Sequence, residues 1–381
     1  MSGASTLVYQ GAACFRQRVV FAALSGRRLR IESIRQEDES PGVTDTEVAF
    51  LRLVSDLSHG AVMDINETGT MVKFTPGVLG GGAVEVDCGT ERGVGYFIEG
   101  VLPMLPFTKE PVVATFSGVT DCNHDPSADM LRDVVLPSLA PFGLEGAELK
   151  IKARGALPLG GGSVTLVCPT LRELKPIDIC EPGFIKRVRG IAFCTKTSPQ
   201  MANRMVDGAR ALLNKFLPDV YIHTDAYKGI SSGNSPGYGV TLYAQSTAGT
   251  MLSTQLIAPP ATLPVAPGTA VAAAAAASDA PNTPEDIGVL ASELLCEVIA
   301  GGGCVDSTVA PLMLTFMALC PEDVSRLRLP AHMSHYTVET LRLLKEFFGV
   351  VFKLKVDEAA EQSVVASCLG VGYKNYSKKV T

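Results

Sequence analysis

The residues of this chain that could do chemistry on a phosphodiester are its carboxylates and histidines. Asp121, Asp125 and Asp129 could together hold Mg²⁺ and support phosphodiester cleavage, because divalent cations of this kind prefer carboxylate oxygens. Asp125 precedes Pro126 and Ser127, however, and that order is typical of a turn followed by a helix cap. We therefore expect structural roles for these carboxylates and keep a metal-dependent nuclease as the alternative.

The histidines and cysteines form no pattern of a metal site or of a nucleophile with its base. Neither H-x-x-x-H nor H-E-x-x-H occurs, and the ten cysteines contain no C-x-x-C pair. Isolated cysteines commonly act as small buried hydrophobes, and we expect surface or hydrogen-bonded roles for the histidines. The sequence therefore predicts no metal and no cofactor. The histidines are His59, His124, His223, His332 and His335.

Two runs of glycine could approach a phosphate closely. Gly80–Gly82 and Gly160–Gly162 each precede a strand-like stretch, and triple glycine permits positive φ and backbone anion binding. Neither run matches G-x-x-x-x-G-K-[ST] or G-x-G-x-x-G. We expect each run to be an ordinary turn between strands.

The charge of the chain limits where a polyanion could bind. The formal net charge is −6 over 381 residues, which argues against indiscriminate nucleic-acid binding over the whole surface. Basic residues cluster in Arg16–Arg35, in Lys186–Arg189 and in Lys374–Lys379. Any RNA contact must therefore be local, and composition alone favours ordinary solvated faces for these clusters.

Helices and strands must position these residues, and the spacing of apolar residues predicts where they lie. The pattern predicts an α/β fold of the α+β type. Hydrophobic residues make up 46% of the chain and charged residues 19%, which is enough apolar material for a core. Helix-like runs followed by strand-like runs occur over residues 95–116, 130–151 and 338–354. We interpret them as repeated units in which helices back a sheet, with prolines that kink or end the first two helices.

The middle of the chain has the pattern of a separate module. Residues 184–258 carry strand, helix, strand and strand patterns, which predicts a smaller inserted α/β domain. Residues 259–284 are dominated by Ala, Pro, Thr and Gly, which predicts a flexible loop. We expect residues 1–183 and 285–381 to form one discontinuous domain, to which the helix after Pro284 returns. No apolar run is long enough to span a membrane, so no membrane partner is expected.

Several motifs taken together resemble one protein family. The run Arg154-Gly-Ala-Leu-Pro-Leu-Gly-Gly-Gly-Ser-Val164 is similar to the P-x-G-G-G signature of the RNA 3′-terminal phosphate cyclases. Residues 190–204 and Phe216-Leu-Pro-Asp-Val220 resemble the inserted domain of that family. Residues 302–308 are similar to its eukaryotic cyclase-like branch. The resemblance covers nearly the whole chain and implies a large domain of repeated units with a smaller α/β domain inserted.

The resemblance implies that cyclase activity would require a nucleophilic histidine, because a cyclase of this family carries AMP on that residue. That histidine opens a helix of the type H-L-A-D-Q, followed by an apolar run that ends in M-A-L. Aligning on Met317-Ala-Leu319 puts Thr308 at the place of the histidine. A threonine hydroxyl lacks the imidazole nitrogen, so the resemblance with this substitution predicts no catalytic residue and no cyclisation.

The resemblance also implies an anion or RNA site built from arginines. The family's loop G-E-G-G-G-Q-x-x-R corresponds to Gly11-Ala-Ala-Cys-Phe-Arg16, which is shorter and lacks the acidic residue but keeps the arginine. Arg35 lies in the family's Ile-Arg segment, and Arg154 stands before the glycine signature. Guanidinium groups grip phosphate oxygens bidentately. The candidate anion-binding or RNA-binding residues are Arg16, Arg35, Arg154, Lys186, Arg187 and Arg189.

For function, the resemblance implies a non-catalytic factor in small-subunit pre-rRNA processing and assembly, located in the nucleolus of the nucleus. The partners that it implies are pre-rRNA, the small nucleolar RNP particle, a ribosome-assembly GTPase and other small-subunit assembly factors. The alternative is an endonuclease that cleaves pre-rRNA with carboxylates and arginines outside the former adenylylation pocket. That alternative requires acidic side chains to converge in space.

Overall fold

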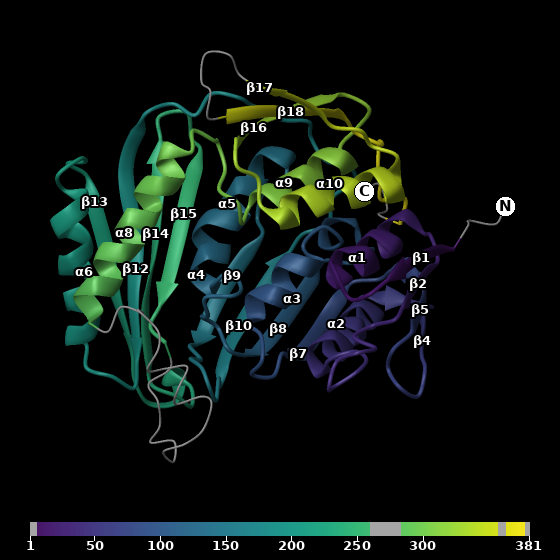
Figure 1. Ribbon diagram of the computed structural model, residues 1–381, viewed down its shortest axis with the longest axis horizontal. Coiled ribbons are helices and arrows are strands. Elements are labelled where there is room, and N and C mark those ends of the chain that lie inside the picture. The colour runs from purple at the N-terminus through teal and green to yellow at the C-terminus, as the bar shows by residue number, and fades with distance from the viewer. Residues whose placement is uncertain (1–5, 260–282, 357–362, 378–381) are drawn as a thin grey trace.

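Three four-stranded sheets of the chain share one topology, β-α-β-α-β-β (Figure 1). The computed structural model describes residues 6–259, 283–356 and 363–377. In each of these sheets the first two strands are parallel, and the other two strands are antiparallel to their neighbours. The predicted fold class, repeated units of a sheet backed by helices, is confirmed.

The first unit has the strand order β1-β2-β5-β4 and two helices. Its α2 begins with a capping box, because the Thr44 side chain accepts from the amide of Glu47 while the Glu47 side chain accepts from the amide of Thr44. A separate two-stranded antiparallel sheet is formed by β3 (Ser58–His59) and β6 (Val78–Leu79). The elements of the unit are β1 (Leu7–Gln10), α1 (Phe15–Ser25), β2 (Leu29–Glu32), α2 (Asp45–Asp56), β4 (Val62–Ile65) and β5 (Val72–Thr75).

The second unit has the order β7-β8-β10-β9. Its second helical segment is broken into short α, π and 3₁₀ turns, as the prolines at 137 and 141 predicted. The glycine run at 160–162 turns closely against the chain, since a Cβ on Gly155 would lie 2.3 Å from the amide nitrogen of Gly162. The unit contains β7 (Gly82–Asp87), α3 (Val94–Val101), η1 (Leu105–Phe107), β8 (Val112–Gly118), α4 (Ala128–Met130), η2 (Leu131–Val135), α5 (Leu136–Leu139), η3 (Ala140–Phe142), β9 (Glu148–Ala153) and β10 (Gly162–Cys168).

The third unit has the order β11-β16-β18-β17, and the chain leaves it after its first strand. Its α10 begins at the capping Ser334 and ends at Gly349, whose φ of +72° suits glycine. Every residue of α9 is buried. The unit contains β11 (Asp178–Ile179), α9 (Ala310–Leu319), β16 (Val324–Pro330), α10 (His335–Phe348), β17 (Lys353–Val356) and β18 (Ser363–Leu369).

Between β11 and α9 the chain builds a smaller sheet with a different order, β13-β12-β14-β15. One face of this sheet packs on two helices around a core of its own, which includes Val188, Met205 and Leu242. Its elements are β12 (Ile185–Thr195), α6 (Gln200–Leu213), β13 (Val220–Tyr227), η4 (Gly229–Ser232), β14 (Gly237–Ser246), β15 (Met251–Ile257) and α8 (Pro284–Ala300).

Helix α8 packs on the small sheet, so the prediction that the chain returns to the larger domain at the helix after Pro284 is wrong. Ile287, Ala291 and Leu295 belong to the core of the small sheet. Helices α6 and α8 approach so closely that a Cβ on Gly288 would lie 2.1 Å from the carbonyl oxygen of Met205 (Figure 1). Apolar spacing shows which face of α8 is buried but not against which sheet.

The helices of the three repeated units face one another in the middle of the molecule, with their sheets around them (Figure 1). One continuous core contains buried residues of all three units, such as Phe21, Phe97 and Phe316. Residues 260–282 of the predicted flexible loop lie outside the described residues. That residues 184–258 form a separate inserted domain stays a prediction. Among the described residues, no helix combines the length and apolarity needed to cross a membrane.

Candidate functional site

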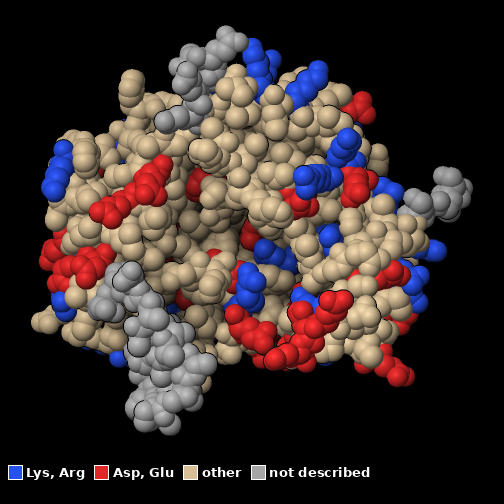
Figure 2. Space-filling model, in the orientation of Figure 1, with Lys and Arg blue, Asp and Glu red and all other residues tan. Residues whose placement is uncertain are grey.

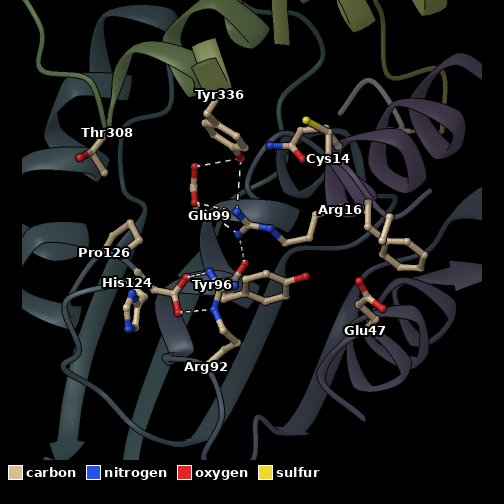
Figure 3. Close-up of a pocket in the computed structure, with 14 residues that line it drawn as sticks. Cys14, Arg16, Glu47, Arg92, Tyr96, Glu99, His124, Pro126, Thr308 and Tyr336 are labelled. Atoms are coloured by element: carbon tan, nitrogen blue, oxygen red, sulfur yellow. Dashed lines mark hydrogen bonds and ion pairs between the residues drawn. The ribbon is translucent and has the colours of Figure 1, made fainter. Parts of the chain in front are cut away.

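A pocket of about 410 Å³ opens where the three repeated units meet. Figure 2 shows basic and acidic side chains gathered around a hollow near the middle of the molecule. Figure 3 shows the side chains that line the pocket. The first unit contributes Ala12, residues 14–17 and Glu47, the second contributes Arg92, Tyr96, Glu99 and residues 124–126, and the third contributes Thr308 and Tyr336.

Arg16 lies in the first turn of α1, and groups from the other two units hold its guanidinium (Figure 3). Nη1 donates to the carbonyl of Tyr96, and Nη1 and Nη2 each lie 3.3 Å from Glu99 Oε2. Nη2 also donates to the hydroxyl of Tyr336 at 3.3 Å. Arg16 Cζ lies 4.0 Å from the centroid of the Tyr96 ring. The predicted arginine therefore faces the pocket but is already paired.

Glu99 on α3 competes with any external anion for Arg16. Burial raises the pKa of Glu99, although the positive charge of Arg16 opposes that shift. The hydroxyl of Tyr336 donates to Glu99 Oε1 at 3.4 Å, and burial also raises the pKa of Tyr336. A phosphate can bind Arg16 in two ways. It can displace the carboxylate of Glu99, or it can bind after Glu99 has taken up a proton.

Arg92 is a second arginine of the pocket, and it is more accessible, with 39% of its side chain exposed. Nε donates to Asp125 Oδ2 at 2.9 Å, and Nη2 donates to Oδ1 of the same carboxylate. Arg92 Cζ lies 4.5 Å from the Tyr96 ring centroid, so one ring serves both arginines. Asp125 also accepts from the amide of Gly93, at the start of α3, at 2.9 Å.

Thr308 lines the opposite wall, in the turn before α9, and Asp306 fixes that turn. Asp306 Oδ1 accepts from the amides of Thr308 and Val309, both at 3.0 Å. Its Oδ2 accepts from the amide and hydroxyl of Ser253 on β15, at 3.0 and 2.6 Å. Burial raises the pKa of Asp306, although these hydrogen bonds oppose the shift. One buried carboxyl thus joins the pocket wall to the small sheet.

Arg35 stands behind the pocket wall rather than in it. Its Nε donates to the carbonyl of Gly42 at 2.9 Å, and its Nη2 forms an ion pair with Glu47, which lines the pocket. Glu47 also accepts from the amide of Thr44 at 3.0 Å. Arg35 itself has a φ of +45°, a left-handed conformation that is uncommon outside glycine. It braces Glu47 and the start of α2.

The structure contradicts the prediction that Arg154 grips an external phosphate, because the side chain is 0% exposed. Its Nη1 lies 2.7 Å from Asp129 Oδ2 and 3.3 Å from Asp121 Oδ2, and its Nη2 lies 2.9 Å from Asp225 Oδ2. Arg154 Cζ also lies 4.8 Å from the ring centroid of Phe193. Asp121 and Asp129 belong to the second unit, whereas Asp225 and Phe193 belong to the small sheet. Arg154 therefore holds these two parts together.

The predicted basic cluster on β12 lies apart from the residues that line the pocket. Arg189 Nη1 and Nη2 donate to the carboxylate of Asp219, at 2.8 and 2.9 Å, and Arg187 donates to Gln245 Oε1. Lys186 is exposed. Of the predicted residues, Arg16 and Thr308 share the pocket, Arg35 supports it, Arg154 is buried elsewhere, and the β12 cluster forms another surface.

The sequence reasoning missed the residues that surround Arg16. Tyr96 and Glu99 stand three residues apart on one helix, and such polar positions in an apolar helical run could have drawn attention to them. Arg92 and Tyr336 carry no local signal, because their partners are distant in sequence. His124 is exposed, as predicted, and it also lines the pocket, where the sequence had assigned it no role.

The carboxylates that could have served a nuclease pair with arginines. Asp121 and Asp129 surround Arg154, and Asp125 binds Arg92. Ser127 caps α4 by accepting from the amide of Met130 at 3.2 Å, as the sequence predicted. Among the described residues, no group of three or more His, Cys, Asp or Glu side chains is placed to hold a metal ion.

Comparison with known proteins agrees with this architecture of repeated units and an inserted sheet. The profile of the family "RNA 3′-terminal phosphate cyclase" matches residues 7–354. The chain belongs to the RNA 3′-terminal phosphate cyclase family, as its sequence motifs predicted.

Within that family the chain is similar to proteins named as cyclase-like. It is 45% identical to the RNA 3′-terminal phosphate cyclase-like proteins of Homo sapiens and Mus musculus, over 98% of this chain and 98% of theirs. It is 40% identical to a protein of Schizosaccharomyces pombe named as an rRNA processing protein, again over 98% of both chains. The likeness therefore extends over nearly the full length of all these proteins.

Replacing Arg154 with Met should destabilise the protein at neutral pH by about 3–5 kcal/mol, because buried carboxylates lose their counter-charge. Burial raises the pKa of Asp121 to about 6, although Arg154 opposes the shift, against about 3.9 in an unfolded chain. Without Arg154 the folded protein binds protons on these carboxyls still more readily. The deficit should therefore shrink as the pH falls from about 7 to about 4. Urea unfolding of both proteins at each pH measures it.

Arg326→Ala is the control, because Arg326 forms an exposed pair with Asp178 at 3.7 Å. That change should cost less than about 1 kcal/mol at either pH. A loss in Arg154→Met that is no larger than this, or that does not change with pH, would contradict the role given to the buried cluster.

Proposed function

We propose that this chain is a non-cyclising factor of small-subunit pre-rRNA processing and assembly. Membership of the cyclase family and the likeness to an rRNA processing protein support a role on ribosomal RNA. The alignment that puts Thr308 at the place of the adenylylated histidine supports a loss of chemistry, since a hydroxyl is no substitute for an imidazole nucleophile.

The observation that carries this proposal is the charge of the pocket. Its wall combines two arginines, Arg16 and Arg92, with three carboxylates, Glu47, Glu99 and Asp125. Both arginines are paired within the wall. A nucleoside triphosphate needs an excess of cations around its phosphates, and this wall has an excess of carboxylates. A single phosphodiester that replaces one carboxylate at an arginine is a better match.

We further propose that the protein works in the nucleolus of the nucleus. Its partners there are pre-rRNA, the small nucleolar RNP particle, a ribosome-assembly GTPase and other small-subunit assembly factors, as the sequence resemblance implies. The residues that we propose for RNA phosphates are Arg16 in the pocket and Lys186, Arg187 and Arg189 on β12, with Arg35 as a support.

Incubation with radiolabelled ATP and Mg²⁺ should leave no covalent AMP on this protein, because Thr308 stands where the alignment puts the nucleophilic histidine of the family. A cyclase of the family that keeps its histidine provides the positive control. An acid-labile protein–AMP adduct would refute the proposal. Loss of such an adduct in His124→Ala would assign it to the imidazole at the pocket.

Depletion of the protein from its own cells should reduce small-subunit rRNA and allow unprocessed pre-rRNA to accumulate, while large-subunit rRNA is maintained. Northern blots with probes for both rRNAs and for their spacers measure this, and re-expression of the wild-type protein controls for indirect effects. Equal loss of both subunits, or normal processing, would show that the proposed small-subunit role is wrong.

Glu99→Gln should strengthen binding of a single-stranded pre-rRNA fragment, because it releases Arg16 for a phosphate. Arg16→Gln should weaken binding and lower the slope of log affinity against log salt by about 0.7. Since burial raises the pKa of Glu99, protonation at lower pH releases Arg16 as well. Binding by the wild type should therefore strengthen as the pH falls, and binding by Glu99→Gln should change less. Fluorescence anisotropy over a salt and pH series measures all of these effects.

The double variant Arg16→Gln with Glu99→Gln controls for stability, because it leaves no unpaired buried charge. It should bind as weakly as Arg16→Gln.

The RNA fragment should also stay intact when it is incubated with the protein and Mg²⁺. Identical affinities and salt slopes in all four proteins would remove the pocket from RNA recognition, and specific cleavage would favour the endonuclease alternative.

A further inference from the structure

One end of the small sheet exposes three large aromatic side chains. Phe184, just before β12, is 85% exposed, Phe216, just after α6, is 71% exposed, and Tyr221 on β13 is 57% exposed. In Figure 1 this is the end at which β15 starts. Aromatic rings in water cost free energy, so their gathering at one end of a small sheet requires an explanation.

The same end carries a cluster of cations around one carboxylate. Arg189 holds Asp219 through two hydrogen bonds, at 2.8 and 2.9 Å. The pKa of Asp219 is lowered, first by that hydrogen bonding and then by the charges of Arg187 and Lys186. Three cations thus lie near a single anion, which leaves a local positive charge on a chain whose formal net charge is −6.

Strand register places one basic and two aromatic side chains in one row. Arg189 is paired with Tyr221 on one neighbouring strand and with Tyr243 on the other. Neighbouring strands lie about 4.8 Å apart, so the three side chains are adjacent. Val188 and Val220, one residue earlier on each strand, point to the opposite face and belong to the core beneath α6 and α8. The row therefore lies on the face opposite to α6 and α8, where Tyr243 packs against the core of the repeated units and Tyr221 stays exposed.

We propose that this basic–aromatic end of the small sheet, defined by Phe184, Lys186, Arg187, Arg189, Phe216 and Tyr221, binds a single-stranded segment of RNA. Unpaired bases stack on exposed aromatic rings, and cations between the rings pair with the phosphates. A duplex hides the faces of its bases and would leave the rings unused. The inference rests on the proposed role on ribosomal RNA and adds a second contact, away from the residues of the pocket.

A partner protein with acidic side chains is the competing occupant of this surface. It would use the cations, but it would not require flat rings at three positions. The combination of rings and cations favours RNA, and an acidic peptide serves as a separate probe for the competing occupant.

The test compares binding of three fluorescent probes to the full chain: oligouridine of about 12 nucleotides, an RNA duplex of the same length, and a poly-glutamate peptide. Tyr221→Ala and Phe216→Ala should each weaken oligouridine binding by about tenfold, because each removes one stacking surface. Lys186→Ala should lower the salt slope by about 0.7. The duplex should bind more weakly than oligouridine and should be insensitive to the aromatic variants.

Tyr376→Ala and Lys150→Ala are the controls. Tyr376 is 90% exposed and lies near the described C-terminus, and Lys150 lies on β9 of the second unit. Neither control should change oligouridine binding. Since every altered side chain is at the surface, thermal melting should give the same midpoint for all five variants as for the wild type, which excludes unfolding as the cause.

Equal oligouridine affinity in the wild type and in Tyr221→Ala and Phe216→Ala would overturn the proposal. It would also be overturned if these variants weakened only the peptide, which would mark a protein-docking surface, or if duplex and single strand bound alike. Retained binding in these variants together with a loss in Arg16→Gln would leave the pocket proposal standing. Failure of the wild type to bind any RNA would refute the role on RNA itself.

Discussion

The buried ion cluster around Arg154 is the constraint on which the arrangement of the molecule depends. Its three carboxylates come from two parts of the chain, Asp121 and Asp129 from the second unit and Asp225 from the small sheet. A charge without its partners is very costly in such an environment, so the two parts are stable only in the orientation that brings all four groups together. This orientation in turn places β15 where Ser253 can bind Asp306.

The pocket follows from the threefold repetition of one topology. Each unit turns its helices toward the middle, and the pocket lies where helix N-terminal regions and their preceding turns from all three units meet, so each unit supplies part of the wall. Arg16, Glu99 and Tyr336 come from three different units and touch one another there. Contacts among three units also explain why no short motif in the sequence reveals the partners of Arg16.

Periodic patterns predicted much of the fold, because a helix or strand with one buried face leaves its period in the sequence. The stretch 338–348 is a helix as predicted, and 95–116 and 130–151 contain the predicted helical turns and strands, but both lie in one unit, so the true repeat is longer. The pattern could not say against which sheet α8 packs. Likewise, family motifs pointed to Arg16 and Thr308, whereas the burial of Arg154 depends on carboxylates that are distant in sequence.

Asp306 has a mechanical consequence for the two surfaces of this protein. It is a buried bridge with one oxygen on the Thr308 turn and the other on β15, so a displacement of the small sheet that moves β15 is transmitted to the pocket wall. A single carboxyl group thus joins the position of β15 to the position of the Thr308 turn. Thermodynamic linkage requires that any coupling through this carboxyl group between ligands of the sheet and of the pocket be equal in both directions.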